Sequence, residues 1–454
     1  IQVAIDVPMD QLFDYLPNDQ ILKIGQYVKV PFGKRQIIGI ICGISSSTNV
    51  PSQKLKKIIF AEEEIIFDKN LFKLLYFVSN YYHHPIGQTI MSVVPSRIKQ
   101  AKGQIKKISK IYEATNKLNL KWIEELPKRK VRLRKLAHAL FLNSIRDSDL
   151  NLSVSNGREC AQELVSLGVA TEKKWIPKFN QPEVSPELNV QQKKVLSALV
   201  KKQDNTAWLI HGITGSGKTE IYLQLLNKFV GKDKSQILIL VPEINLTPQL
   251  EARFKHRFPN KILVTLHSHL SGIERLNNWR KAKSGEAQII IGTRLAVFTP
   301  LPNLKLIIID EEHDGSFKQH EGLRYHARDV AMMRAKYENV PIVLGTATPA
   351  LETWFNARGE NAKYRYLELT TRAVKNAKLP IIHTIPAGDK YGPTISNIII
   401  EAIQSRINRQ EQVLIFINRR GYAPVLVCSN CGWSANCERC STRLVVHLKT
   451  KRLK

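Results

Sequence analysis

A phosphate-binding loop is the feature that most restricts what this chain can fold into. The segment Gly212-Ile213-Thr214-Gly215-Ser216-Gly217-Lys218-Thr219 follows the apolar run Ala207 to Ile210 and opens a helical segment, Glu220 to Val230. This order of strand, loop and helix is the one that such a loop requires. Its glycines let the backbone curl so that successive N–H groups and the helix N-terminus point at phosphate oxygens. The pattern predicts an α/β lobe that binds ATP through all eight residues.

An acidic segment downstream supplies the catalytic partners of this loop. The buried strand predicted at Leu306 to Ile309 runs into Asp310-Glu311-Glu312-His313. We expect Lys218 to neutralise the β and γ phosphates, Thr219 and Asp310 to hold Mg²⁺, and Glu311 to polarise the attacking water. An acidic run after a strand is, on its own, more often a solvated loop. The upstream loop favours the catalytic interpretation, with Lys218, Asp310 and Glu311 as catalytic residues.

Three further segments place polar groups at the ends of predicted strands. They are Val241-Pro242-Glu243, Ile291-Gly292-Thr293-Arg294 and Gly345-Thr346-Ala347-Thr348-Pro349. Parallel α/β sheets bind their ligands at the carboxyl edge, where these segments would meet. In motor ATPases such segments contact a nucleic-acid backbone or sense phosphate release, so Arg294 is a candidate DNA contact. Taken singly, each segment is only a turn.

The charge balance favours nucleic acid as the partner. The formal net charge is +29, and six of the eight residues from Lys128 to Lys135 are basic. An excess of this sign attracts polyanions such as DNA and RNA. A lysine-biased proteome, an anionic membrane surface, or a merely solvated helix face at 128–135 remain alternatives. Apolar runs such as Ile37 to Ile41 are far too short to span a bilayer, and no secretory signal opens the chain, which predicts no membrane anchor and a cytoplasmic location.

With 454 residues, the chain is too long for one hydrophobic core and should contain several domains. The first 95 or so residues alternate short β-branched runs with Pro and Gly, which is typical of a small β-rich module. A helix is expected from about Asp68 to Tyr82, with Leu71, Leu74, Leu75 and Val78 at helical spacing. Linkers are predicted at Ala101 to Lys110 and at Lys178 to Glu187, on either side of a helical module.

The order of these motifs resembles that of the PriA family, the bacterial primosomal protein N′ family of superfamily 2 DNA helicases. The resemblance is carried by Gly212 to Thr219, Val241 to Gln249, Asp310 to His313, Tyr325 to Asp329, and Asn418 to Gly421. It implies a multidomain fold: a 3′-end DNA-binding β-rich domain (1–100), a winged helix (111–177), RecA-like lobe 1 (188–372), the beginning of RecA-like lobe 2 (373–427) and an incomplete cysteine-rich zinc-binding region (428–454).

The resemblance also implies sites for DNA and for adenine. In the first domain Phe13, Asp14, Tyr15, Gly33 and Lys56 would form a pocket for the nascent 3′ terminus of a fork. There the aromatic rings would cover the terminal base, Asp14 would accept from the free 3′ hydroxyl and Lys56 would meet phosphate. Gln192 would lie in the segment that recognises adenine.

Asp314 to Asp329 is similar to the family's aromatic-rich loop, which couples binding of single-stranded DNA to ATP hydrolysis. Stacking and charge would come from Phe317, Lys318, Arg324, Tyr325 and Arg328. The chain departs from the family at Leu323, where a Trp is usual, and Leu stacks poorly.

Four cysteines form two C-x-x-C pairs: Cys428, Cys431, Cys437 and Cys440. Each pair can donate two thiolates to tetrahedral Zn²⁺. Only five residues separate the pairs, 432–436, which is tight for one ion bound by all four cysteines. The resemblance implies two further pairs downstream and two zinc sites with interleaved ligands. Cys42 and Cys160 are interpreted as ordinary buried thiols.

The function implied is an ATP-dependent 3′ to 5′ DNA helicase that recognises stalled or abandoned forks and starts replication restart by primosome assembly. Its partners would be branched and single-stranded DNA, the single-stranded DNA-binding protein and primosome proteins. The chain stops before the motifs that carry the second lobe's arginine finger, whose loss costs about 10³ to 10⁵ in rate. We therefore expect this chain to bind nucleotide and DNA but to hydrolyse ATP poorly. The alternatives are a fork-binding scaffold that uses ATP only as a switch, and a P-loop kinase or duplex translocase.

Overall fold

The computed structural model contains two compact units, Ile1–Lys375 and Asn376–Lys454. The described residues are 1–99, 110–127, 129–146, 150, 154–174, 185–201, 204–230, 234–242, 248–374, 381–385, 396–416, 426, 428, 430–437, 444, 446–447 and 452–453. Within these ranges, no helix combines the length and the apolar character needed to cross a bilayer.

The N-terminal module is a five-stranded antiparallel sheet with the strand order β2-β1-β4-β3-β5. Alternate residues of the third strand, such as Val28 and Val30, are buried, whereas Lys29 between them is half-buried. This period of two is what places one face of a sheet on a core. The strands are β1 (Gln2–Ile5), β2 (Phe13–Asp14), β3 (Gln26–Phe32), β4 (Arg35–Gly43) and β5 (Phe60–Ile65), with a short 3₁₀ turn η1 (Ser52–Lys54) before the last.

Three helices follow the sheet: α1 (Lys69–Tyr81), α2 (Ile86–Val93) and α3 (Ser96–Lys99). The carboxylate of Asp68 caps α1 by accepting from the backbone N–H of Leu71 (2.8 Å). The predicted helical stripe is confirmed, since Leu71, Leu74, Leu75 and Val78 are all buried. This face packs against the α/β lobe (residues 188–372), with which the helices share one hydrophobic core.

Residues 110–174 contain a small unit with its own core. A three-stranded antiparallel sheet, order β7-β6-β8, is covered by helices whose buried residues include Leu136, Ala137 and Leu164. The elements are β6 (Lys110–Ala114), α4 (Leu120–Glu125), α5 (Val131–Leu142), β7 (Ile145–Arg146), α7 (Gly157–Ser166) and β8 (Ala170–Lys174). The described part of the basic run, 129–135, leads into the first turn of α5, and Lys128 lies outside the described residues. The assignment to a winged helix stays a prediction.

The α/β lobe is built on a seven-stranded parallel sheet with the order β11-β12-β10-β13-β14-β9-β15. This confirms the predicted α/β lobe. The strands are β9 (Ala207–Gly212), β10 (Gln236–Leu240), β11 (Leu263–Leu266), β12 (Ile289–Gly292), β13 (Leu304–Asp310), β14 (Ile342–Thr346) and β15 (Arg365–Leu369). The helical segments are α8 (Val190–Lys201), α9 (Lys218–Phe229), α10 (Pro248–Arg257), α11 (Gly272–Lys283), η3 (Arg294–Phe298), η4 (Gly315–Phe317), α12 (Ala327–Glu338) and α13 (Leu351–Arg358).

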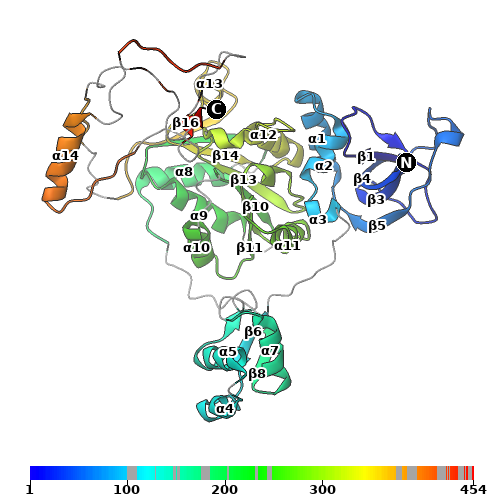
Figure 1. Cartoon of the computed structure of the whole chain (residues 1–454). Helices are drawn as coiled ribbons and strands as arrows, with labels where there is room; N and C mark the ends of the chain where they lie inside the picture. Colours follow the sequence, from blue (N-terminus) through cyan, green and yellow to red (C-terminus); the bar gives the residue numbers. More distant parts are fainter. Residues whose placement is uncertain are drawn as a thin grey trace. The chain divides into compact units, whose positions relative to one another are not determined.

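Both faces of this sheet are covered by helices (Figure 1). Ile237 and Ile239 pack with α8, α9 and α10, whereas Leu238 and Leu240 pack with α11 and α12. Strands buried on both faces read as continuous apolar runs, which is why the run in β13 was recognisable in the sequence.

The order of the sheet places β13, β14 and β9 side by side. Parallel strands bring their carboxyl ends to one edge, where α/β proteins bind ligands. The phosphate-binding loop follows β9, and the acidic segment begins with the last residue of β13. The segment Gly345 to Pro349 begins with the last two residues of β14. Three motifs that are far apart in the sequence therefore meet.

The second unit contains α14 (Asn397–Asn408) and a two-stranded antiparallel pair, β16 (Val446–His447) and β17 (Arg452–Leu453). No residue of α14 is buried within this described part of the unit, and Ile398, Ile400 and Ile407 are exposed. Asn418 to Gly421, which carried part of the resemblance, and Cys440 lie outside the described residues, as does Glu243 to Thr247 in the first unit.

The contact of α2 with β1 generates a stability prediction. A Cβ added at Gly87 would lie 2.3 Å from the backbone oxygen of Ile5, so Gly87→Ala forces the helix and strand apart. We expect a loss of about 1–3 kcal/mol, seen as faster amide hydrogen exchange in β1 and α2 of the full chain. Gly315→Ala, where a Cβ meets nothing within 4 Å, should leave exchange in these elements unchanged. Equal exchange in the Gly87 variant and the wild type would refute the steric argument.

Candidate nucleotide and DNA site

The phosphate-binding loop has the backbone that its glycines predict. Gly215 and Gly217 have φ values of +79° and +83°, a region that side chains with a Cβ rarely adopt. At Gly217 space is also limiting, because a Cβ there would lie 2.3 Å from Nε2 of Gln192. Gly217 caps the N-terminus of α9, so the free N–H groups of this helix face the loop.

Two buried side chains hold the loop in shape. Nζ of Lys218 donates to the carbonyl oxygen of Gly212 (2.8 Å), within the loop itself. Gln192, predicted to contact adenine, donates through Nε2 to the carbonyl oxygen of Ser216 (2.8 Å) and accepts from the backbone N–H of Asn189 (2.9 Å). Gln192 thus lies directly against the loop, and adenine recognition by this residue stays a prediction.

Asp310 ends β13 in a half-buried position beside the loop. Its Oδ1 accepts a hydrogen bond from the hydroxyl of Tyr222 (3.1 Å), which lies on α9. Burial, and then the adjacent Glu311 carboxylate, raise the pKa of Asp310 to about 6, although Tyr222 and Lys218 act in the opposite direction. The burial of Tyr222 and the proximity of Asp310 raise the pKa of the phenol, so its hydroxyl stays a donor.

Glu311 has a backbone φ of +49°, which is uncommon for a residue with a side chain. Such conformations are held in place by surrounding structure and occur often at active sites. The neighbouring His313 bonds through Nδ1 to Oγ1 of Thr346 (2.7 Å) on β14. The acidic segment is thereby fixed to the Gly345-Thr346 segment, and the Glu311 side chain remains partly exposed.

These residues fit ATP and Mg²⁺. An anionic phosphate would take over the ammonium of Lys218 from the Gly212 carbonyl, and a divalent cation would offset the cost of ionising half-buried Asp310. The hydroxyl of Ser216 is buried and has no hydrogen-bond partner among the described residues. Lys218 and Thr219 begin α9 after the loop that follows β9, and Asp310 and Glu311 lie at the end of β13, so the four residues predicted as a group lie at the same edge of the sheet.

Glu312 connects this site to the predicted DNA-binding loop. Its carboxylate is completely buried and accepts from Ala350 N (2.8 Å), Thr353 Oγ1 (2.8 Å) and Arg328 Nη1 (3.0 Å). Arg328, predicted to bind DNA, also donates through Nε to Asp329 (3.1 Å). Its guanidinium is thus engaged inside the protein, and the role of Glu312 was missed because its partners are distant in the sequence.

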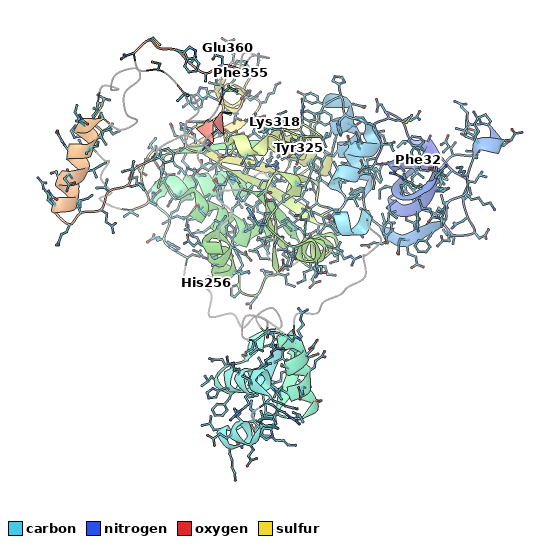
Figure 2. The ribbon with its side chains drawn as sticks, in the orientation of Figure 1. Phe32, His256, Lys318, Tyr325, Phe355 and Glu360 are labelled. Carbon is cyan, nitrogen blue, oxygen red and sulfur yellow. The ribbon has the colours of Figure 1, made fainter. Side chains whose placement is uncertain are left out.

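The loop from Asp314 to Asp329 is closed on itself. Lys318 pairs with His326 as an isolated bridge, and Nζ of Lys318 donates to the carbonyl oxygen of Arg324 (2.6 Å). Lys318 and Tyr325 are both labelled in Figure 2. The rings of Phe317 (1% exposed) and Tyr325 (3% exposed) are buried, so stacking on bases would require both to leave the core.

The remaining predicted cations of this surface are placed differently. Arg324 is exposed, whereas Arg294 is half-buried and donates through Nε to Oε1 of Gln319 (2.6 Å) in the loop. Leu323, at the position where the family has Trp, is buried. Arg294 therefore braces the aromatic-rich loop in addition to its predicted contact with DNA.

Tyr82, at the end of α1, contacts this loop from the N-terminal module. Its hydroxyl accepts from the backbone N–H of His326 (3.2 Å), and Nζ of Lys318 lies 5.3 Å from the centre of its ring. Nothing in the sequence spacing indicates this contact, which joins residues 244 positions apart.

The residues predicted for a 3′ terminus lie on neighbouring segments of the N-terminal sheet. The Phe13 ring meets Phe32 edge to face, with centroids 5.3 Å apart, and Asp14 accepts from Thr48 Oγ1 (2.6 Å). Tyr15 is buried, and its hydroxyl donates to the carbonyl oxygen of Pro31 (3.1 Å). Its ring therefore belongs to the core beneath the sheet surface, and its hydrogen bond holds β3 near Phe32.

Gly33, at φ +58°, turns the β3–β4 hairpin beside Phe32, and the carbonyl oxygen of Lys56 accepts from Leu16 N (2.9 Å). The side chain of Lys56 is exposed. The segment of Phe13 to Tyr15 thus contacts the β3–β4 hairpin next to Gly33, and the following residue contacts the backbone of Lys56; a pocket for the 3′ terminus stays a prediction.

The first cysteine pair forms a tight turn. The carbonyl oxygen of Cys428 accepts from Gly432 N (3.0 Å), and Cys428 N donates to the carbonyl oxygen of Trp433 (2.8 Å). The backbone N–H of Cys431 is the first cause of a lowered pKa at Cys428. Among the described residues, which exclude Cys440, no group of three or more metal-ligating side chains is assembled.

A parallel sheet with a phosphate-binding loop, an acidic segment and a cationic loop at one edge defines the ATP-binding lobe of a nucleic-acid motor. The comparisons agree: residues 189–355 match the DEAD/DEAH box helicase family, and residues 2–95 match the PriA 3′ DNA-binding domain. Over 98% of its length the chain is 36% identical to the replication restart protein PriA of Haemophilus influenzae and 32% identical to that of Synechocystis. Over nearly its whole length the chain is thus similar to the replication restart proteins PriA.

The chain spans less than two thirds of the length of these relatives. It covers 62% of the Haemophilus influenzae protein and 64% of the Synechocystis protein. With the Bacillus subtilis replication restart protein PriA it shares 41% identity over 55% of this chain and 31% of that protein.

The ion pair of Glu312 with Arg328 should contribute to the stability of the motor lobe. Arg328→Met would leave a buried carboxylate without its counter-charge, so we expect unfolding of the motor lobe to require about 3–5 kcal/mol less. Urea denaturation followed by tryptophan fluorescence measures this change. Adding Glu312→Gln to that variant should restore part of the loss, and Arg358→Met, at a surface cation over Tyr366, should change little. An Arg328→Met chain as stable as the wild type would rule out a structural role for the pair.

Proposed function

We propose that the protein is an ATP-dependent DNA helicase that moves 3′ to 5′, recognises stalled or abandoned replication forks and initiates replication restart through primosome assembly. One observation carries this proposal. The ATP site and the cationic loop share the buried carboxylate of Glu312, and the loop contacts Tyr82 of a PriA-type DNA-binding domain. The acidic segment of the proposed nucleotide site, the cationic loop and the N-terminal module are thus linked by hydrogen bonds.

The chemistry at the nucleotide follows from the four residues at the sheet edge. Lys218 neutralises charge on the β and γ phosphates, and Thr219 and Asp310 hold Mg²⁺. The bound ion supplies charge neutralisation for the transferred phosphoryl group. Glu311 orients the attacking water and accepts its proton, a role that suits a carboxylate kept partly exposed by its backbone conformation.

Coupling to DNA runs through Glu312 and α12. Arg328 stands in the first turn of this helix, directly after the aromatic-rich loop, and bonds Glu312 next to the catalytic pair. A movement of the loop on DNA therefore changes a buried hydrogen bond beside Asp310 and Glu311. Single-stranded DNA is contacted at its phosphates by Lys318, Arg324 and Arg294, and at its bases by Phe317 and Tyr325 after release from the core.

Three further assignments rest on the family. Residues 111–177 are a winged helix that adds a DNA contact through the basic start of α5. The cysteines 428, 431, 437 and 440 hold Zn²⁺, shared between two sites in the complete protein. The single-stranded DNA-binding protein and primosome proteins are the proposed protein partners.

Lys218→Ala tests the motor. Because the ammonium is lost while the N-terminal sheet is untouched, we expect the full-length protein to lose ATP-dependent unwinding and to keep nearly unchanged affinity for forks. A strand-separation assay and a fork-binding titration measure the two properties. Unwinding by the variant would remove the motor assignment. A wild-type protein that binds forks tightly without DNA-stimulated phosphate release would instead be a scaffold that uses ATP as a switch.

Asp14→Asn tests recognition of the 3′ terminus. A carboxylate accepts from a 3′ hydroxyl but repels a 3′ phosphate, so the wild-type chain should prefer forks that end in a hydroxyl. We expect the preference to shrink about tenfold in Asp14→Asn, since the amide removes the repulsion. Fluorescence-anisotropy titrations with the two fork ends measure it, and Asp19→Asn serves as an exposed carboxylate control. An undiminished preference in Asp14→Asn would place the 3′ end elsewhere.

A further inference from the structure

Tyr222 is a polar residue within the ATP site that the sequence motifs do not include. It follows Lys218 by one turn of α9, is 1% exposed and donates its hydroxyl proton to Oδ1 of Asp310 (3.1 Å). We propose that Tyr222 is a positioning residue that fixes the Asp310 carboxylate for Mg²⁺. This inference rests on the proposed function, in which Asp310 and Thr219 hold the ion.

The neighbouring strand is shaped to admit the phenol. A Cβ added at Gly345 of β14 would lie 1.6 Å from the hydroxyl oxygen of Tyr222, closer than any two unbonded atoms can approach. Only glycine at this position lets the hydroxyl reach Asp310. Gly345 belongs to the segment Gly345 to Pro349, so this segment contributes to the site by leaving space.

The hydrogen bond restricts the carboxylate in two ways. It occupies a lone pair of Oδ1, and it opposes rotation of the carboxylate about the Cβ–Cγ bond. A ligand with a fixed orientation binds a cation more tightly than one that must first be ordered. The phenol belongs to the same helix that carries Lys218 and Thr219, so one helix positions the phosphate ligand and both oxygen ligands of the ion.

A role for Tyr222 in packing alone would not require the hydrogen bond from its hydroxyl to Asp310. A tyrosine that only filled space between α9, β13 and β14 would be replaceable by phenylalanine without effect on the ion. Tyr222→Phe removes only the hydroxyl and keeps the ring, and thereby separates packing from positioning.

The test uses the intact chain and a fluorescent ATP analogue, titrated at several Mg²⁺ concentrations. We expect Tyr222→Phe to bind the analogue normally without Mg²⁺ but to need about tenfold more Mg²⁺ to reach half of the Mg²⁺-dependent gain in affinity. Binding of Mn²⁺ in the presence of the analogue, followed by electron paramagnetic resonance, gives a second readout and should weaken similarly. Tyr366→Phe is the matched control, because its hydroxyl bonds to His211 Nδ1 (2.9 Å) on the same sheet, away from Asp310.

The outcomes separate this inference from the proposed function. An unchanged Mg²⁺ midpoint in Tyr222→Phe, or an equal loss of affinity with and without Mg²⁺, overturns the positioning role while the ATP site stands. A wild-type chain that binds no analogue at any Mg²⁺ concentration overturns the proposed function itself. Gly345→Ala should reproduce the higher Mg²⁺ requirement, since its methyl group displaces the phenol; normal Mg²⁺ dependence in a folded Gly345→Ala chain counts against the role.

Discussion

The structure of the motor lobe depends on the hydrogen bonds and the ion pair of one buried carboxylate, that of Glu312. A charge removed from water is tolerated only with a counter-charge and enough hydrogen bonds to replace its hydration. Glu312 obtains these from the backbone of Ala350, the hydroxyl of Thr353 and the guanidinium of Arg328. If any one of these three donors moved away, the buried carboxylate would lose a hydrogen bond that water could not replace. The acidic segment, the start of α13 and the start of α12 are therefore held as one piece.

Helix α12 extends this connection away from the nucleotide. Arg334, fully buried, donates to the carbonyl oxygens of Val297 (2.6 Å) and Thr299 (2.8 Å), at and after η3. One turn further, Glu338 accepts from Asn70 Nδ2 of α1 (3.0 Å). The same helix thus contacts the nucleotide site at its first turn and the DNA-binding module at its last. A rigid helix with such contacts transmits displacement rather than absorbing it.

What the sequence predicted correctly is local in origin. Glycine spacing dictates the loop between β9 and α9, and strands buried on both faces reveal themselves as apolar runs such as that of β13. The partners of individual side chains were not predictable in the same way. Arg328 was expected on DNA and is bonded to Glu312, and Tyr15 was expected on a base and supports Pro31. Such pairings depend on which segments the fold brings together, and the spacing of residues along the chain does not indicate which segments these are.

The burial of Phe317 and Tyr325 sets an energetic condition on the aromatic-rich loop. Removing a large apolar side chain from the core costs about 1.5–3 kcal/mol, and stacking on a base returns about 1–3 kcal/mol. These terms nearly cancel, so stacking alone cannot open the loop. With Leu323 in place of a third aromatic ring, the return is smaller still. In the proposed function, phosphate contacts of Lys318 and Arg324 would then supply the difference. Since such contacts weaken with salt, the proposed coupling of DNA to ATP would be governed chiefly by charge.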